Sequence, residues 1–158
     1  MQKVTAYINI GSNMGDRPAN LSRAVALISE LSGGGVTSVS DVVESEPWGY
    51  VSDHMFLNVG VLLDTVLEPE VLLDLLQRVE RALWPVAHRD SAGAYVDREV
   101  DVDLITYGDE VIDTARLKVP HPFMAERRFV LLPLVQLMPE WKHPLTGLTA
   151  RDMLARLG

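Results

Sequence analysis

The sequence contains no cysteine, which excludes disulfides, thiolate catalysis and zinc–thiolate sites. It also lacks a long apolar run, because no stretch approaches the ~18 residues that are needed to span a bilayer. The first residues lead directly into a strand-like segment without a signal-peptide pattern. We therefore expect a soluble, cytoplasmic protein with no membrane partner.

Basic residues are few. The chain has 14 Lys and Arg against 22 Asp and Glu, which gives a formal net charge of −8. Nucleic acids and anionic membranes need a basic surface, so the overall charge argues against both as partners. If the substrate is an anion, the few arginines must gather around it locally.

Two common nucleotide-binding patterns are also missing. The glycine-containing segment 11–13 lacks the spacing and the lysine of a phosphate-binding loop, and no Rossmann glycine pattern follows the first strand. A Ser-His-Asp triad cannot be placed, and His54, His88 and His143 show no metal-ligand spacing. We expect these three histidines to be structural.

What is present is enough apolar material for one core. With 158 residues and 47 % hydrophobic side chains, the chain is predicted to form a single domain over residues 1–158. Period-two alternation predicts strands, and apolar spacing of three and four predicts helices. The expected strands are 4–10, 36–43, 56–63 and 99–107, and the expected helices are 16–31 and 68–79, with Val71, Leu72, Leu75, Leu76 and Val79 on the apolar face of the second helix.

The order β-α-β-β-α-β is typical of an α+β, ferredoxin-like fold, an antiparallel sheet with two helices on one face. Extra C-terminal helices are expected near 129–137 and 149. Residues 84–97 have no clear period and are predicted to form a loop. Because this architecture hosts many activities, function must be argued from particular residues.

The strongest chemical signal is the pair Asp101 and Asp103. In a strand, residues two apart face the same side, so their carboxylates are expected to lie together. Paired carboxylates suit magnesium, which also binds water and substrate phosphates. The alternative is that both residues belong to the solvated face of an amphipathic strand.

Other polar and aromatic residues become informative beside that pair. His121 and Arg127 could hold phosphate oxygens, although, taken alone, these residues are better explained as a turn histidine and a solvated helix start. Trp48, Phe56, Tyr95 and Phe129 could stack on a flat heteroaromatic ligand, and Asn58 could hydrogen-bond its edge. The alternative for isolated aromatics is the core, and for Gln77 and Glu80, three apart on one helix, a plain polar surface.

Taken together, several segments resemble the 6-hydroxymethyl-7,8-dihydropterin pyrophosphokinase family of folate biosynthesis. They are the segments 6–13 (AYINIGSN), 56–58 (FLN), 98–104 (REVDVDL), 119–121 (VPH) and 129–134 (FVLLPL). Their order and spacing extend nearly end to end along the chain.

The resemblance implies a ferredoxin-like enzyme that transfers pyrophosphate from ATP to the hydroxymethyl group of the dihydropterin and releases AMP. It implies two magnesium ions at Asp101 and Asp103, with ATP and a dihydropterin as small-molecule partners. Separately, we expect a monomer. By the same resemblance, the catalytic residues are Arg98, Asp101 and Asp103; the ATP-binding residues are Gln77, Glu80, Arg98, Arg116, His121 and Arg127; and the pterin-binding residues are Ser45, Trp48, Phe56, Asn58, Tyr95 and Phe129.

The chain departs from the family pattern before the two aspartates. The usual Arg-Trp-Gly-Pro-Arg-Thr is here Ala94-Tyr95-Val96-Asp97-Arg98-Glu99, so one arginine is missing; Arg89 is a candidate replacement. Glu46 stands where a proline is usual. These changes keep open the alternative of a catalytically weakened module that binds pterin and nucleotide. A third alternative, an interaction domain with neither ligand, would require the aspartate pair and the His-Arg segment to be coincidental.

Overall fold

The computed structural model describes residues 2–84, 97 and 99–158. Its elements follow the expected order. After the strand expected over 99–107, the structure adds two short strands and a 3-10 turn. They are β1 (Val4–Ser12), α1 (Arg17–Leu31), β2 (Val36–Val39), β3 (Val43–Ser45), β4 (Phe56–Thr65), α2 (Pro69–Leu83), β5 (Asp101–Tyr107), β6 (Ile112–Asp113), β7 (Lys118–Val119), η1 (Met124–Glu126), α3 (Arg128–Leu137) and α4 (Ala150–Leu157).

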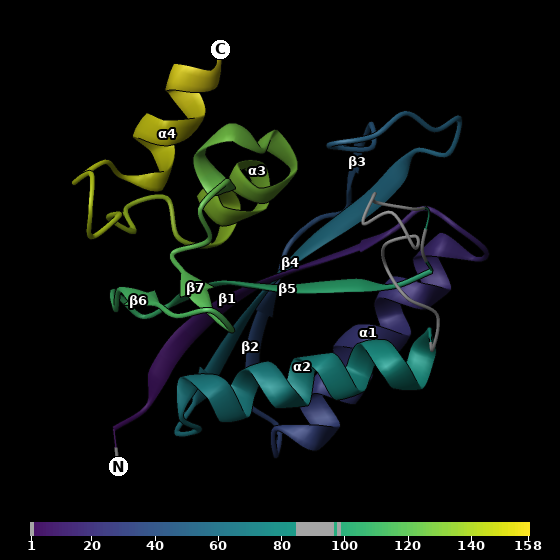
Figure 1. Ribbon diagram of the computed structural model, residues 1–158, viewed down its shortest axis with the longest axis horizontal. Coiled ribbons are helices and arrows are strands. Elements are labelled where there is room, and N and C mark those ends of the chain that lie inside the picture. The colour runs from purple at the N-terminus through teal and green to yellow at the C-terminus, as the bar shows by residue number, and fades with distance from the viewer. Residues whose placement is uncertain (1, 85–96, 98) are drawn as a thin grey trace.

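The central sheet is antiparallel, with strand order β2-β4-β1-β5 and β3 paired to β4. Helices α1 and α2 cover one face, while α3 and α4 lie on the other (Figure 1). This is the predicted ferredoxin-like arrangement with added C-terminal helices.

Alternation along β1 builds the two layers of the core. Ala6, Ile8 and Ile10 are fully buried in the cluster that α1 and α2 complete. Tyr7 points the other way, into the cluster under α3, where its hydroxyl donates to the carbonyl of Val130 at 2.6 Å. Burial raises the pKa of that phenol, so it stays protonated and serves as a donor.

The expectation of one strand over 36–43 was wrong. The strand β2 ends at Val39. Ser40 N–H still donates to Gly60 O at 2.9 Å, but the Ser40 hydroxyl replaces its carbonyl as the acceptor of Gly60 N–H, at 2.8 Å, and Asp41 N–H donates to the Gln136 side chain at 2.9 Å. Pairing resumes at β3. The position of Val71 was also wrong, since its side chain is 49 % exposed while Leu72, Leu75, Leu76 and Val79 are buried.

Helix α3 covers only one end of its face of the sheet. It packs over Tyr7, Leu62 and Ile105. The other end of the same face, which carries Asn9 and Asp103, lines a pocket. The pocket therefore opens where the second helical layer ends.

Candidate functional site

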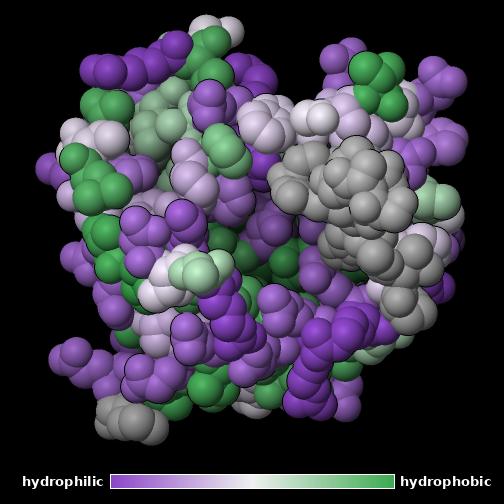
Figure 2. Space-filling view, viewed as in Figure 1, coloured by the Kyte–Doolittle hydropathy of each residue, from purple (hydrophilic) through white to green (hydrophobic). Residues whose placement is uncertain are grey.

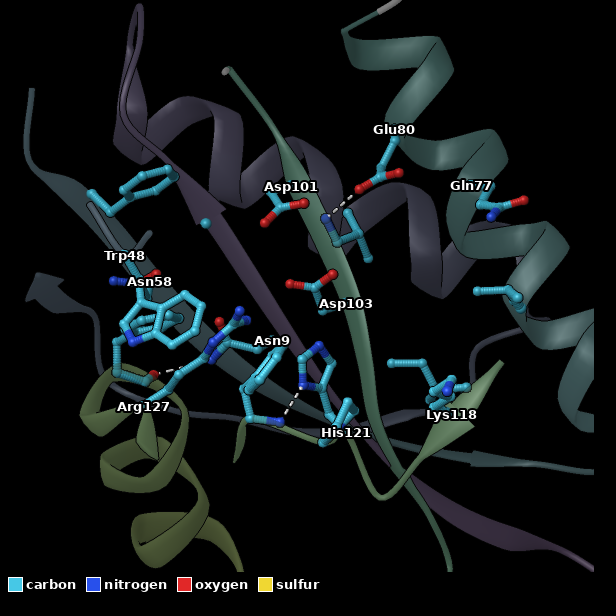
Figure 3. A pocket seen from close by; sticks show the side chains of 18 of the residues that line it. Asn9, Trp48, Asn58, Gln77, Glu80, Asp101, Asp103, Lys118, His121 and Arg127 are labelled. Atoms are coloured by element: carbon cyan, nitrogen blue, oxygen red, sulfur yellow. Dashed lines mark hydrogen bonds between the residues drawn. The ribbon is translucent and has the colours of Figure 1, made fainter. Parts of the chain in front are cut away.

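A cavity of about 500 Å³ opens between β5, α2 and the segment that leads into β4. Figure 2 shows the hollow from the same side as Figure 1, with hydrophobic residues in its depth and hydrophilic ones along its lower rim. Figure 3 shows the lining from close by, with acidic residues on β5 and α2 facing Trp48, Arg127 and His121.

Asp101 and Asp103 lie on one side of β5 and point into this cavity (Figure 3). Their register partners on β1 are Gly11 and Asn9, while the alternating Val102 and Leu104 are buried in the core. Both aspartates are half-buried and line the cavity. The alternation predicted from the sequence is confirmed.

This donor set fits magnesium. Two carboxylates from one strand supply the hard oxygen ligands that the ion takes from proteins, and the adjoining cavity leaves room for substrate phosphates and water. Across the described residues, no three carboxylate, imidazole or thiol side chains form a complete metal cage. Such a pair suits a metal that is bound jointly with its substrate.

Helix α2 is linked to β5 by Glu80, whose Oε2 accepts from the backbone N–H of Val102 at 2.7 Å. One turn earlier, Gln77 also faces the cavity. Arg116 reaches this helix from the segment before β7: its guanidinium pairs with Asp74 and lies 3.4 Å from Gln77 Oε1. These contacts bring Glu80, Gln77 and Arg116, which the sequence predicted as ATP-binding residues, together along one side of the cavity.

His121 is held as a neutral donor. Its Nδ1 accepts from the backbone N–H of Phe123 at 3.2 Å, so the neutral ring carries its proton on Nε2. Burial, reinforced by the charge of Arg127 and opposed by that of Asp101, lowers the pKa of His121 to about 4. At neutral pH the ring can donate one hydrogen bond to an oxygen ligand without adding a charge.

Arg127, the residue that immediately precedes α3, is buried among aromatic rings. Its guanidinium carbon lies 4.2 Å from the ring centroid of Trp48, 5.5 Å from that of Phe123 and 5.8 Å from that of Phe129. Its Nε has no hydrogen-bond partner among the described residues, although the residue is only 8 % exposed. A buried cationic donor that lacks a partner and lines a cavity is suited to an anionic ligand.

The amide of Asn58 is fixed by its own neighbours. Its Nδ2 donates to Val43 O at 3.1 Å and to Ser45 Oγ at 2.8 Å. A Cβ on Gly11 would approach Asn58 Oδ1 to 3.1 Å and the Phe56 ring to 3.2 Å, so glycine leaves the space beside both side chains open. The result is an aromatic and amide wall opposite the aspartates.

The predicted site residues gather as expected, except for two that lie outside the described part of the chain. All the others line the same cavity: Ser45, Trp48, Phe56, Asn58, Gln77, Glu80, Asp101, Asp103, Arg116, His121, Arg127 and Phe129. Arg98 and Tyr95, like Arg89 and most of the predicted loop 84–97, are outside the described residues.

Sequence reasoning missed Asn9, Lys118 and Phe123, which also line the cavity. The sequence did indicate Asn9, as a polar residue between the apolar Ile8 and Ile10; in the structure it is buried and its Nδ2 donates to Phe129 O at 3.1 Å. Nothing in the sequence indicated Phe123, because its ring contacts Trp48, at a centroid distance of 5.2 Å, only in the folded chain.

The chain matches the family model of 7,8-dihydro-6-hydroxymethylpterin-pyrophosphokinase (HPPK) over residues 7–139. A 2-amino-4-hydroxy-6-hydroxymethyldihydropteridine pyrophosphokinase of Bacillus subtilis is 42 % identical over 142 residues, which cover 90 % of this chain and 83 % of that protein. The protein of the same name from Porphyromonas gingivalis is 37 % identical over 139 residues, covering 87 % and 92 %.

Solved structures agree on the fold. An HPPK-DHPS crystal structure in complex with substrates superposes with a TM-score of 0.75 at 13 % identity, covering 99 % of this chain and 43 % of that one. Plasmodium falciparum HPPK-DHPS with SDX-DHP gives a TM-score of 0.74 at 15 % identity, covering 98 % and 44 %. This chain thus spans less than half the length of those solved chains.

None of its described helices has both the length and the apolar character needed to cross a membrane. By its family match and its curated relatives, the chain belongs to the 7,8-dihydro-6-hydroxymethylpterin-pyrophosphokinase family.

Proposed function

We propose that this chain transfers pyrophosphate from ATP to the hydroxymethyl group of 6-hydroxymethyl-7,8-dihydropterin and releases AMP, the family's step in folate biosynthesis. The observation that carries the proposal is one cavity lined by an acidic pair, phosphate-binding donors and an aromatic–amide wall. A binding module for pterin alone would not need the acidic pair and the cations together.

Asp101 and Asp103 would hold magnesium, and we propose two ions as the resemblance implies. When bound, magnesium neutralises developing charge on the phosphates and orients the reacting groups. The two carboxylates lie on a paired strand of the sheet, which fixes their positions before the substrates arrive.

The phosphate-binding donors lie on the other side of the cavity. Arg127 offers a planar fork that suits phosphate oxygens, and His121 offers a neutral Nε2–H. Gln77, Glu80 and Arg116 form the nucleotide side, and Arg98 is proposed as a further phosphate contact and catalytic residue from its place in the sequence. Together these groups would orient the β-phosphorus toward the pterin hydroxyl.

The pterin ring would lie against Trp48, Phe56 and Phe129. Flat heteroaromatic rings stack favourably on aromatic faces, and Asn58, beside Ser45, would hydrogen-bond the edge of the ring. Tyr95 is proposed as a further contact from the sequence. We also propose that the protein acts as a cytoplasmic monomer.

The test is AMP release from ATP and magnesium, with and without the dihydropterin. Pterin-dependent AMP well above background is the expected result. Binding of pterin and ATP without AMP would instead identify a module that has lost catalysis, as the altered residues 94–99 suggested. Absence of binding and of turnover would reject both functions and leave an interaction domain.

A further inference from the structure

The segment between β3 and β4 is bound by the carboxylate of a residue far away in the sequence. Asp97 Oδ1 accepts from Asn13 Nδ2 at 2.8 Å and from the Tyr50 hydroxyl at 3.0 Å. Its Oδ2 accepts from Ser52 Oγ at 3.0 Å and lies 2.8 Å from His54 Nδ1. Four donors therefore meet on one carboxylate.

These bonds connect three parts of the chain. Asn13 follows β1, residues 50–54 precede β4, and Asp97 lies four residues before Asp101. Asn13 Nδ2 also lies 3.0 Å from the Tyr50 hydroxyl and 3.2 Å from the carbonyl of His54. Asp97 thus completes a polar network that joins the chain shortly before β5 to residues 50–54, which precede β4.

Most of this network is shielded from solvent. Asn13 is 3 % exposed and the Asp97 side chain 24 %, whereas the His54 side chain is 60 % exposed. An exposed ion pair such as His54–Asp97 contributes little by itself. The bonds from Asn13, Tyr50 and Ser52 are the ones expected to hold the segment. Burial alone would raise the pKa of Asp97, but the four hydrogen bonds outweigh it and keep that pKa below its usual value, so the carboxylate is ionised at neutral pH.

The anchored segment is flanked on both sides by the pterin wall. Trp48 lies two residues before Tyr50, and Phe56 two residues after His54; both line the cavity. Arg17 also fixes this end, since its guanidinium donates to the carbonyl of Met55 at 2.9 Å. A shift of residues 50–54 would therefore move the aromatic side chains of both Trp48 and Phe56.

We propose that Asp97 is a positioning residue that anchors residues 50–54 and thereby sets the pterin-binding wall formed by Trp48, Phe56 and Asn58. The proposal rests on the proposed function. Asp97 stands where the family pattern usually has proline, a residue whose side chain cannot accept a hydrogen bond. In this chain a carboxylate anchor thus takes the place of a proline.

The experiment compares Asp97→Asn with Asp53→Asn, a charge-matched change at an exposed residue of the same segment. Asparagine keeps the volume of Asp97 but presents one oxygen and an amide N–H₂ to four donors. We expect the KM for the dihydropterin to rise about tenfold, with kcat and the KM for ATP changed less than about twofold. Asp97→Glu should recover part of the loss, and Tyr50→Phe should reproduce part of it.

Hydrogen exchange of the peptide around 49–56, in the protein without substrates, gives a readout that does not depend on turnover. Faster exchange in Asp97→Asn but not in Asp53→Asn supports the anchor. Unchanged exchange overturns it, as does an unchanged KM for the pterin in an active enzyme. Failure of the wild-type protein to form AMP would count against the proposed function, while the exchange comparison would still decide whether Asp97 anchors the segment.

Discussion

At the scale of single residues, Asp103 gives the most direct test of the proposed metal site. Asp103→Asn keeps the shape of the side chain but removes the negative ligand, so pterin-dependent AMP formation should fall about 100-fold or more. Thermal unfolding should change little, because the carboxylate faces the cavity and is not in the core.

Asp109→Asn is the matched control, since Asp109 is exposed in the turn that follows β5. An Asp103→Asn enzyme that kept a near-normal rate, with an unchanged dependence on magnesium, would show that this carboxylate is not a metal ligand.

The substitution Arg127→Lys tests whether ATP binding and stability require a planar cation at this position. Lysine keeps the charge but cannot lie flat on the Trp48 ring or present two parallel donors. Arg127→Lys should raise the KM for ATP about tenfold and lower the free energy of unfolding by about 1 kcal/mol through the lost cation–π contact. Arg128→Lys, at the exposed neighbouring residue, should change neither quantity. An unchanged KM for ATP in Arg127→Lys would make the role of Arg127 one of charge alone, and an equal effect in both variants would mean that the effect is not specific to Arg127.

At the scale of elements, the contact between α2 and β5 depends on Glu80. Glu80→Ala removes the acceptor of the Val102 N–H and should lower the free energy of unfolding by about 1–2 kcal/mol. It should also lower the rate of AMP formation, because Val102 lies between the two aspartates. Glu80→Gln retains an oxygen and should restore most of both losses; an equally damaging glutamine would mean that the charge acts and not the hydrogen bond.

The packing of α3 on β4 depends on Gly60. A Cβ at this position would lie 2.7 Å from the Cβ of Pro133, in α3, and 2.8 Å from the ring of Tyr7, in the core beneath that helix. Gly60→Ala should therefore lower the free energy of unfolding by about 1–3 kcal/mol, because the helix must move away from the sheet. Chemical denaturation measures this change, and a loss below about 0.3 kcal/mol would mean that the core adjusts freely.

The elements also show how far the sequence could be interpreted. Long periodic segments such as α1 and α2 were predicted, because spacing of three and four marks a buried helix face directly. Val71 was misassigned because it borders that face without entering the core. The break between β2 and β3 depends on Ser40 bonding to Gly60, a contact between separate strands that local pattern does not encode.

The site residues were predicted from the family motifs, which mark positions but not contacts. Trp48 and Arg127 were both named, yet their stacking joins residues that are distant in the sequence. Asp97 was noted only as a departure from the pattern. Its four hydrogen bonds become visible when β1 and the segment before β4 are brought together.

At the scale of the whole molecule, the half-buried His121 and the buried His143 are expected to set the dependence of stability on acid. Burial lowers the pKa of His143 and, more strongly, that of His121, to about 4. In the unfolded chain both titrate near ~6.5, so the unfolded state binds more protons below that pH. Their contribution to stability is complete above about pH 6.5 and is lost as the pH falls toward 4.

Denaturation at pH 7, 5.5 and 4.5 checks this expectation, and the free energy of unfolding should decrease in that order. His121→Asn should flatten the dependence. The lowered pKa of Asp97 adds little to the change in stability between pH 7 and 4.5, because its effect appears only below about pH 4. A slope that is unchanged in His121→Asn would assign the acid sensitivity to other groups.

The outer side of β5 is an edge of the central sheet, and it is covered by parts of the site itself. The Glu80 side chain occupies the N–H of Val102, and the backbone N–H of His121 occupies the carbonyl of Ile105 at 2.8 Å. Exposed strand edges invite pairing with other chains, which leads to aggregation. A strand from another molecule could add here only by displacing both groups. The two contacts that hold Glu80 and His121 beside the cavity therefore also cover this edge against association with another strand.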